Sequence, residues 1–217
     1  MGEQEARLRE EMVRYGNLLL ERALVTGTGG NISVRLPDDR GMLITPSGMP
    51  YAEIGPEDIV RVDLAGNVLG GTRRPSIERL MHLEIYRRRP DVGAIVHAHP
   101  PFCTAVAACR RDLEPITDVI AAVFGGPVRT SAYARVGTPE LACNVAEVLG
   151  QGRAALIANH GAVTVGPDLA SAFDLCIILE SCAQVFVYAH LLGQPVVLPP
   201  EVVREEKEDL ARRYGQR

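Results

Sequence analysis

The spacing of apolar residues divides the chain into alternating helical and extended segments. Between residues 4 and 24, leucines and a methionine recur among charged residues at helical spacing. Short apolar runs bounded by turn-forming residues predict strands at 32–36, 42–45, 59–62, 94–99 and in the run 154–160. Further helices are expected to begin near Ser76, Pro101, Thr138, Asp168 and Pro200. This alternation indicates the α/β class.

The same pattern shows no boundary between domains. The chain has 217 residues and contains no linker rich in proline, glycine or serine, no block of like charge and no internal repeat. Tight turns are expected at Asp38-Asp39 and at 65–67, between short strands. We therefore expect a single domain that spans residues 1–217.

The net charge limits the kinds of partner, and the cysteines indicate the redox compartment. The net charge is -4, with both signs mixed along the chain, so neither nucleic acid nor a membrane is an expected partner. A small acidic substrate would need a local positive site, such as a metal ion or a helix N-terminus. The five cysteines are odd in number, lack CxxC spacing and lie in apolar helical contexts, which predicts buried free thiols in a reducing compartment.

Two segments bear on localisation. The N-terminus is charged where a signal peptide would need an apolar core. The longest apolar stretch, 169–192, is interrupted by Asp174, Glu180 and Gln184, which favours a core or interface helix over a membrane span. A cytoplasmic protein is expected.

Three histidines close apolar runs and predict a metal site. His97 and His99 lie on one face of a strand, roughly 6.6 Å apart at about 3.3 Å per residue, and His160 ends a second apolar run. Three imidazoles around a cation such as Zn²⁺ would leave a coordination position open for a substrate. Glu78, expected in the first turn of the helix that leads to the His97 strand, supplies a nearby carboxylate. Each histidine taken alone could be a half-buried core residue.

The other two histidines are expected to be ordinary helix-face residues. His82 has a helical context, and His190 lies late in the long apolar helix.

Glycine-rich turns suggest an anion site. The segments 26–31 and 45–48 could bring backbone N–H groups close to a phosphate, and Ser76 adds a hydroxyl at a helix start. This depends on the three segments converging; otherwise the turns are simply tight turns. The chain contains neither the spacing of a dinucleotide fingerprint nor a P-loop, so nucleotide binding is not supported.

Taken in order, these motifs resemble the class II aldolase/adducin family over nearly the whole chain. The motifs are Gly29-Gly30-Asn31, Thr45-Pro46-Ser47-Gly48, Pro75-Ser76-x-Glu78, His97-x-His99-Pro100 and Asn159-His160-Gly161. The match is best with the branch that cleaves L-fuculose 1-phosphate. The resemblance implies an αβα layered fold around a largely antiparallel sheet, one catalytic Zn²⁺ per subunit, and a homotetramer with active sites at the subunit interfaces.

The resemblance also implies roles for individual residues. The implied zinc ligands are His97, His99 and His160, and the implied contacts to the substrate phosphate are Asn31, Ser47, Gly48 and Ser76. Glu78 would be the base that removes a proton next to the ketone, while zinc stabilises the enediolate. The expected reaction is reversible cleavage of a ketose 1-phosphate, such as L-fuculose 1-phosphate or a related deoxy-ketose 1-phosphate, to dihydroxyacetone phosphate and a small aldehyde.

Three positions show where this chain departs from the family pattern or follows it near the C-terminus. The family's aldolases have Ser-Ser-Glu where this chain has Ser76-Ile77-Glu78, so Ile77 either replaces a phosphate-binding hydroxyl or packs in the core. Asp118 stands where the pattern carries a tyrosine that acts across the subunit interface. Tyr214 matches a tyrosine near the C-terminus that handles the proton of the aldehyde half, although a tyrosine near a chain end is more often a surface residue.

Other functions share this fold. The sugar-phosphate 4-epimerases of the family have motifs similar to Ser-Ser-Asp and HTHS, whereas this chain has Ser-Ile-Glu and HAHP. An aldolase is therefore preferred to an epimerase. A decarboxylase would use the same metal to stabilise an enolate. A non-enzymatic adducin-like module is expected to lack the ligand set, and all three histidines and Glu78 are present.

Overall fold

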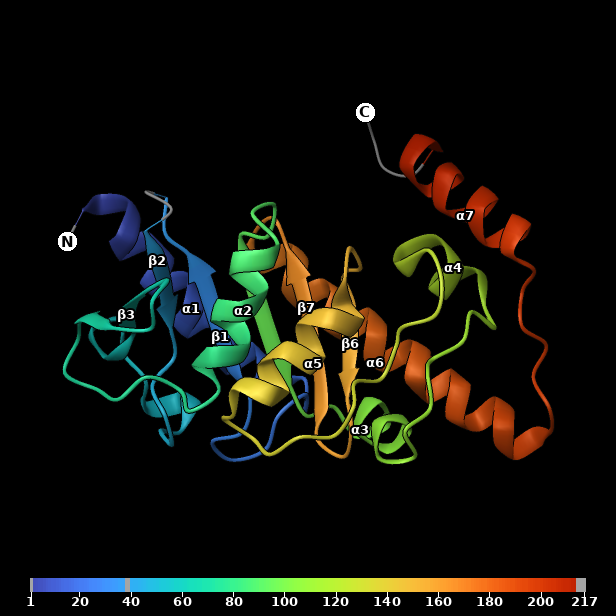
Figure 1. Cartoon of the computed structure of the whole chain (residues 1–217), viewed down its shortest axis with the longest axis horizontal. Coiled ribbons are helices and arrows are strands. Elements are labelled where there is room, and N and C mark those ends of the chain that lie inside the picture. Colours follow the sequence, from blue (N-terminus) through green and yellow to red (C-terminus); the bar gives the residue numbers. More distant parts are fainter. Residues whose placement is uncertain (1, 38–39, 214–217) are drawn as a thin grey trace.

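The computed structural model is built on one antiparallel sheet of seven strands in the order β4-β3-β2-β1-β5-β7-β6 (Figure 1). The structure describes residues 2–37 and 40–213. The strands are β1 (Asn31–Arg35), β2 (Gly41–Ile44), β3 (Val60–Asp63), β4 (Val68–Gly70), β5 (Ala94–Ala98), β6 (Ala154–Ile157) and β7 (Gly161–Gly166). Every neighbouring pair in the sheet is antiparallel.

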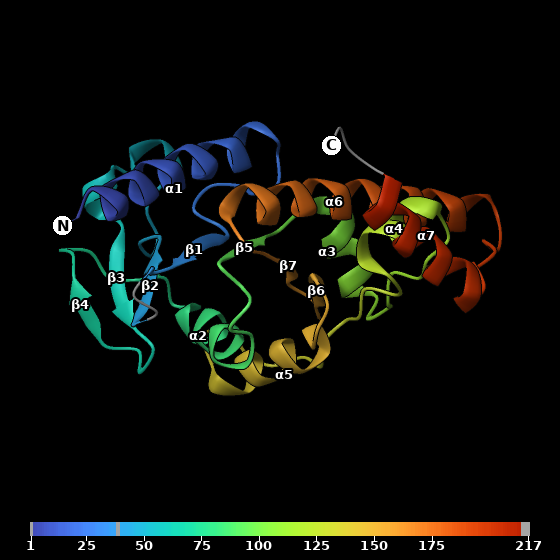
Figure 2. The same ribbon diagram turned by 90° about the horizontal axis from the view of Figure 1, so that it is seen from above.

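Helices cover both faces of this sheet. The α-helices are α1 (Glu3–Glu21), α2 (Arg79–Arg88), α3 (Pro101–Ala108), α4 (Asp118–Phe124), α5 (Pro139–Leu149), α6 (Leu169–Leu192) and α7 (Pro200–Arg213), and the 3-10 helices are η1 (Tyr51–Glu53) and η2 (Pro56–Asp58). Helices α1 and α6 lie on one face, and α2 and α5 lie on the other (Figure 2). The α/β class and the αβα layering expected from the sequence are confirmed.

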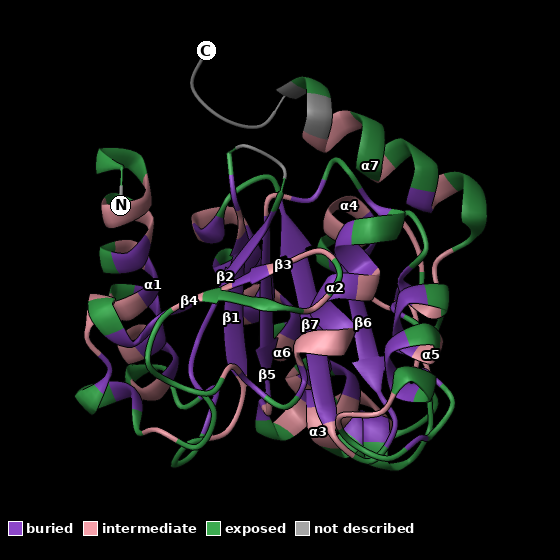
Figure 3. Ribbon diagram, turned by 60° about the vertical axis from the view of Figure 1, so that its left-hand side comes forward, coloured by how far each residue is buried: buried purple, intermediate pink, exposed green. Residues whose placement is uncertain are grey.

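Strands β1, β2, β5, β6 and β7 are buried almost throughout because each face of this part of the sheet packs against helices, whereas the edge strand β4 is largely exposed (Figure 3). Met42, Ile95 and Val163 belong to the core shared with α2 and α5. Ile32 and Val96 point to the other side and pack with α1 and the first half of α6. This two-sided burial explains why the strands read as continuous apolar runs rather than as alternating ones.

Helix α6 is a core helix, as expected. It is long and apolar enough to cross a membrane by length and composition alone. Within the fold, however, Leu169 and Phe173 pack in the core beside α1, and Leu179 and Phe186 pack in a further core beside α3 and β6. The apolar side chains of α6 therefore pack in two parts of the hydrophobic core.

Most predicted elements are confirmed, but two strands, one α-helix and the two short 3-10 helices were missed. Strand β7 follows β6 after a turn of three residues, so one apolar run contains two strands. Strand β4 has three residues at the edge of the sheet, and α4 has seven, both too short to show periodicity. The predicted turn at Asp38-Asp39 lies outside the described residues.

The expectation that all five thiols are buried is wrong for two of them. All are free, but Cys109 and Cys143 are exposed because they lie on the outer sides of their helical segments.

The register of the sheet brings the predicted site together at one edge. Asn31 at the start of β1 lies opposite His97 near the end of β5. Ala98, the last residue of β5, lies opposite Ala162 near the start of β7. Residues from three chain segments that are far apart in sequence therefore meet at the same end of the sheet.

Candidate metal centre

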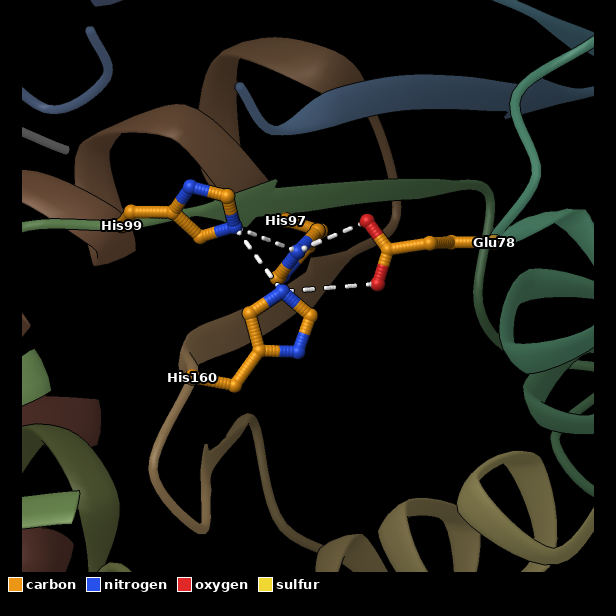
Figure 4. Close-up of side chains that lie close together, drawn as sticks. All are labelled: Glu78, His97, His99 and His160. Carbon is orange, nitrogen blue, oxygen red and sulfur yellow. Dashed lines mark hydrogen bonds and ion pairs between the residues drawn. The ribbon is translucent and has the colours of Figure 1, made fainter. Parts of the chain in front are cut away.

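Three imidazoles and one carboxylate converge at this edge (Figure 4). His97 Nε2 lies 3.1 Å from His99 Nε2, which lies 3.0 Å from His160 Nε2. Glu78 approaches from the other side, with Oε2 3.1 Å from His97 Nε2 and Oε1 3.6 Å from His160 Nε2. One ligand atom from each of the four residues lies within 4.8 Å of the others, which is compact enough for one ion.

The histidines are held in place by the backbone around them. His97 is fully buried within β5, and His99 follows the strand, with its backbone N–H bonded to the carbonyl of Leu24. His160 comes from the β6–β7 turn, where Asn159 has a positive φ of 57°. Asparagine adopts this left-handed conformation more readily than most residues, which explains the Asn before the histidine.

Two glycines make room for His99. A Cβ on Gly29 would lie 2.9 Å from His99 Nδ1, and a Cβ on Gly161 would lie 2.4 Å from the Ala98 carbonyl oxygen. A side chain at either position would push the β1 approach or the β7 start away from β5. At least this part of the glycine-rich segment 26–31 is therefore needed for packing the histidines.

The donor set fits a metal ion. His97 Nδ1 lies 2.9 Å from the carbonyl of Ala162, an acceptor, so Nδ1 carries the proton and the lone pair of Nε2 faces the cluster. Three imidazole nitrogens this close cannot satisfy one another, because each neutral ring has only one N–H to donate. Glu78 Oε1 is also buried without a hydrogen-bond partner among the described residues. Converging unsatisfied lone pairs are what a cation would satisfy.

The pKa shifts of His99 and His160 agree with this interpretation. Burial, together with the neighbouring His97, lowers the pKa of His99 to about 3 and that of His160 to about 4, so both rings are neutral at pH 7, as metal ligands must be. Burial alone would raise the pKa of Glu78, but the adjacent His97 outweighs it and holds the carboxyl well below its usual range. For His97, burial opposes protonation, but the attraction of Glu78 prevails and raises the pKa.

The predicted phosphate-binding segments lie side by side. The Ser76 N–H donates to the carbonyl of Thr45, and the Ser47 N–H donates to that of Arg74. Ser47 and Gly48 are exposed, whereas Ser76 is buried and its Oγ accepts from the Glu78 N–H at 3.2 Å. The 45–48 loop is thus joined to the Glu78 segment, and phosphate binding at this place stays a prediction.

The Asn31 side chain has a different environment from that of Ser47. It is buried, Nδ2 donates to Glu78 Oε2 at 2.9 Å, and Oδ1 lies 2.5 Å from His82 Nε2. Its side chain therefore reaches toward the carboxylate and the helix rather than toward the exposed loop.

His82 is the residue whose importance the sequence interpretation missed. It does lie on α2, as expected, but it is fully buried and hydrogen-bonded at both ring nitrogens, to Ser33 and to Asn31. Glu78 is the N-cap of α2 rather than part of its first turn, and His82 lies one turn further on. The spacing of four residues on one helix was the signal available. His190, in contrast, packs on Phe186 near the end of α6.

The three remaining predicted positions are Asp118, Tyr214 and Ile77. Asp118 is the first residue of α4, at the opposite end of the sheet from α3, which begins directly after His99 and Pro100 (Figures 1 and 3). It borders a cavity of about 540 Å³ between α4, α6 and α7. Tyr214 lies outside the described residues. Ile77 is 58% exposed, so the alternative that it packs in the core is wrong.

Comparison with known proteins identifies the family. Residues 10–187 match the model of the class II aldolase and adducin N-terminal domain. The chain belongs to this family. It is 39% identical over 212 residues to the 5-deoxy-D-ribulose 1-phosphate aldolase of Bacillus thuringiensis, covering 96% of this chain and 97% of that protein. A solved structure of an L-fuculose 1-phosphate aldolase superposes with a TM-score of 0.91 at 41% identity, covering 94% and 96% of the two chains.

The family also contains other chemistry. The 3-oxo-tetronate 4-phosphate decarboxylase of Haemophilus influenzae is 36% identical over 183 residues, covering 82% of this chain and 86% of that protein. Membership in the aldolase/adducin family therefore identifies the class of enzyme and leaves the reaction to the details of the site.

Proposed function

We propose that this protein is a zinc-dependent aldehyde-lyase that cleaves a ketose 1-phosphate reversibly to dihydroxyacetone phosphate and a small aldehyde. The observation that carries the proposal is the convergence of His97, His99, His160 and Glu78 on one point, with Glu78 Oε1 unsatisfied. When bound there, a divalent cation supplies Lewis-acid polarisation of the oxygens of an α-hydroxyketone. Zinc is proposed because three neutral imidazoles with an open position suit it.

Glu78 is the residue proposed to move the proton. Its pKa is held below the usual range, so it is ionised at neutral pH and able to accept a proton from carbon. In the cleavage direction the hydroxyl of the aldehyde half loses its proton as the C–C bond breaks, and Glu78, after taking up a proton from that step or from solvent, protonates the carbon of the three-carbon fragment. Oε1 is the oxygen proposed to carry the proton, because Oε2 already accepts from Asn31.

Ser47, Gly48 and Ser76, with Asn31 as a further predicted contact, are proposed to bind the phosphate. The 45–48 loop is exposed and lies beside the segment that leads to Glu78, so a phosphate on it would be tethered close to the base. A fixed phosphate keeps the reacting carbon within reach of Glu78, which replaces a random encounter by a bound geometry.

The aldehyde half is proposed to involve a second subunit. Helix α4, which begins at Asp118, lies at the other end of the sheet from α3, which begins directly after His99 and Pro100 (Figures 1 and 3). Any role of Asp118 at the metal would therefore require another copy of the chain. Leu191, Leu192 and Val196 are highly exposed apolar residues after the core part of α6, as an interface between subunits would need. A homotetramer in the cytoplasm, with Asp118 and Tyr214 contributed across interfaces, is the proposed assembly.

The first substrate to test is 5-deoxy-D-ribulose 1-phosphate. The relative that acts on it, by its name, aligns over 97% of its own length, and L-fuculose 1-phosphate is the second choice. Zinc-loaded protein should release dihydroxyacetone phosphate from one of these ketoses. Release of CO₂ from a 3-oxo acid phosphate, without aldolase activity, would instead support the decarboxylase alternative, and interconversion of pentulose phosphate epimers would support an epimerase.

The role of Glu78 is tested by Glu78→Gln, which keeps the shape and removes the base. This variant should bind metal and fold normally, while exchange of the C–H of dihydroxyacetone phosphate with deuterated solvent slows by about 10²–10⁴. Exchange at the normal rate would show that another group is the base.

A further inference from the structure

A buried chain of hydrogen bonds runs between α2 and β1 and ends at Glu78. Tyr86 Oη lies 2.9 Å from Ser33 Oγ, and Ser33 Oγ lies 2.6 Å from His82 Nδ1. The other ring nitrogen, His82 Nε2, lies 2.5 Å from Asn31 Oδ1. Asn31 Nδ2 then donates to Glu78 Oε2 at 2.9 Å. Four side chains in line thus end on one oxygen of the proposed base.

The chain is closed off from solvent, so its members must satisfy one another. Ser33 and His82 are fully buried, and Tyr86, Asn31 and Glu78 are at most 6% exposed. A buried polar atom left without a partner costs free energy comparable to a lost hydrogen bond. The orientation of each donor is therefore set by its neighbours rather than by water.

The acceptors fix the direction of the chain. An ionised carboxylate only accepts, so the Asn31 amide must turn Nδ2 toward Glu78 and Oδ1 toward His82. His82 Nε2 must then carry the ring proton. Burial lowers the pKa of His82 to about 3, so the ring is neutral and its Nδ1 accepts.

The rest of the chain follows from that tautomer. Because His82 Nδ1 accepts, the Ser33 hydroxyl must donate to it, and the Tyr86 hydroxyl donates to Ser33 in turn. Every donor in the chain points toward Glu78.

We propose that His82 is a positioning residue for the base: through Asn31 it holds a donor on Glu78 Oε2, so that the carboxylate is fixed in orientation and exchanges protons at Oε1. This inference rests on the proposed role of Glu78. It gives the Asn31 side chain a role at the base in addition to the phosphate contact proposed for this residue. Without the His82 N–H, the Asn31 amide is free to turn its oxygen toward the carboxylate, which repels it.

The first test observes the proton on His82 directly. Long-range ¹H–¹⁵N correlation spectra of the full-length protein, with zinc bound and after chelation, report which ring nitrogen is protonated. We expect His82 as the neutral Nε2–H tautomer in both forms, assigned by its absence from the His82→Gln spectrum. A Nδ1–H tautomer or a charged ring at pH 7 would reverse the chain and overturn the inference.

The second test measures the consequence for proton transfer. His82→Leu removes the donor to Asn31, and the solvent exchange of dihydroxyacetone phosphate should slow by about 10–100-fold, the usual cost of losing such a supporting contact, with metal content and KM unchanged. His82→Gln places an amide near the position of Nε2 and should restore most of the rate. Rescue of this kind is not expected from a residue that only fills space.

Thr164→Val is the matched control. Thr164 is fully buried in β7 and its hydroxyl donates to the carbonyl of Ala172 at 2.7 Å, so this variant loses one buried hydrogen bond away from Glu78. It should lower the melting temperature and leave the exchange rate unchanged. If His82→Leu behaves in the same way, His82 is structural and the inference is wrong.

Two further outcomes keep the result interpretable. If both Glu78→Gln and His82→Leu exchange at the normal rate, the proposed function fails. If Glu78→Gln exchanges slowly and His82→Leu exchanges at the normal rate, only the positioning role fails. Should His82→Leu not fold, Ser33→Ala replaces it, because it removes the donor to His82 Nδ1 and leaves the ring in place. A mixed tautomer with slower exchange is then expected, and an unchanged tautomer and rate would overturn the inference.

Discussion

The two ends of the central sheet differ in how much of the proposed chemistry this chain supplies by itself. At the end where β5 finishes, one chain provides three imidazoles, a carboxylate and a buried hydrogen-bond network around them. At the other end, α4 presents Asp118 and the exposed apolar side chain of Val119 beside a cavity between helices. The first end has the form of a completed site, whereas the second has the form of a surface that needs a partner.

This difference divides the proposed reaction into two halves. Removal of a proton next to the ketone needs only the metal end, whereas handling of the aldehyde oxygen is assigned to Asp118 and Tyr214. Solvent exchange of dihydroxyacetone phosphate reports the first half, and cleavage of the whole ketose phosphate reports both. Comparing the two assays can therefore locate the effect of a variant.

The largest expected effect is at the metal end. Replacing His97 and His99 together by alanine removes two of three nitrogen ligands, and the protein should lose its bound metal equivalent, its exchange activity and its cleavage activity. Metal analysis after gel filtration measures the first of these. His190→Ala, a histidine of α6 outside the cluster, is the control and should keep one equivalent. A double variant that still holds a full equivalent would remove the metal assignment.

The second-largest effect is expected from changing Tyr214 or Asp118, the residues assigned to the aldehyde half of the reaction. Removing residues 214–217, or changing Tyr214→Phe, should slow ketose cleavage by about 10²–10⁴, the range for loss of an acid/base group. Exchange of dihydroxyacetone phosphate should stay normal, because it does not use the aldehyde half. Asp118→Asn tests the other candidate in the same pair of assays. Normal cleavage by a variant would exclude that residue from the mechanism.

The metal end could be predicted from the sequence because its information is local. Alternation along one strand places His97 and His99 on one face, and a short motif presents Glu78 at a helix start. Packing, by contrast, is not visible in short motifs: Gly29 and Gly161 are needed because His99 lies against them. The same applies to the sheet order, which follows from pairing between distant segments.

His82 shows why part of the site was missed. Its two partners, Ser33 and Asn31, lie about fifty positions earlier in the chain and meet it only because β1 packs beneath α2. Helical context alone suggests a surface residue, and only tertiary structure shows that the ring is buried. Ile77 is the opposite case, because a branched apolar side chain suggested a possible core position and the structure exposes it.

The burial of His82 also predicts a pH dependence of stability. Its pKa is about 3 in the folded protein against 6.5 ordinarily, so between these values the unfolded chain takes up a proton that the folded chain does not. The free energy of unfolding should therefore fall with decreasing pH by about 1.4 kcal/mol per unit from this residue, and its full contribution is present only above pH 6.5. Denaturant unfolding of metal-free wild type and His82→Gln should show their stability difference narrowing by about 2 kcal/mol from pH 7 to pH 5. A constant difference would mean that His82 is not buried as a neutral ring.

The smallest expected effect concerns Ile77, at the rim of the metal end beside the predicted phosphate contacts. Ile77→Ser restores the hydroxyl of the family pattern next to Ser76, and a hydrogen bond to a phosphate contributes about 1.5–3 kcal/mol, or about 0.5–1.5 kcal/mol if it is no better than a neutral pair. The gain should appear as a lower KM for phosphorylated ketoses with kcat unchanged, because the contact is made equally in the ground and transition states. Since the side chain is 58% exposed, the melting temperature should hardly change. Ile77→Ala is the control, because it removes the same apolar bulk without adding a hydroxyl. An equal fall in KM for both variants would mean that the isoleucine merely obstructs the substrate. No fall in KM for either variant would place the phosphate away from this position.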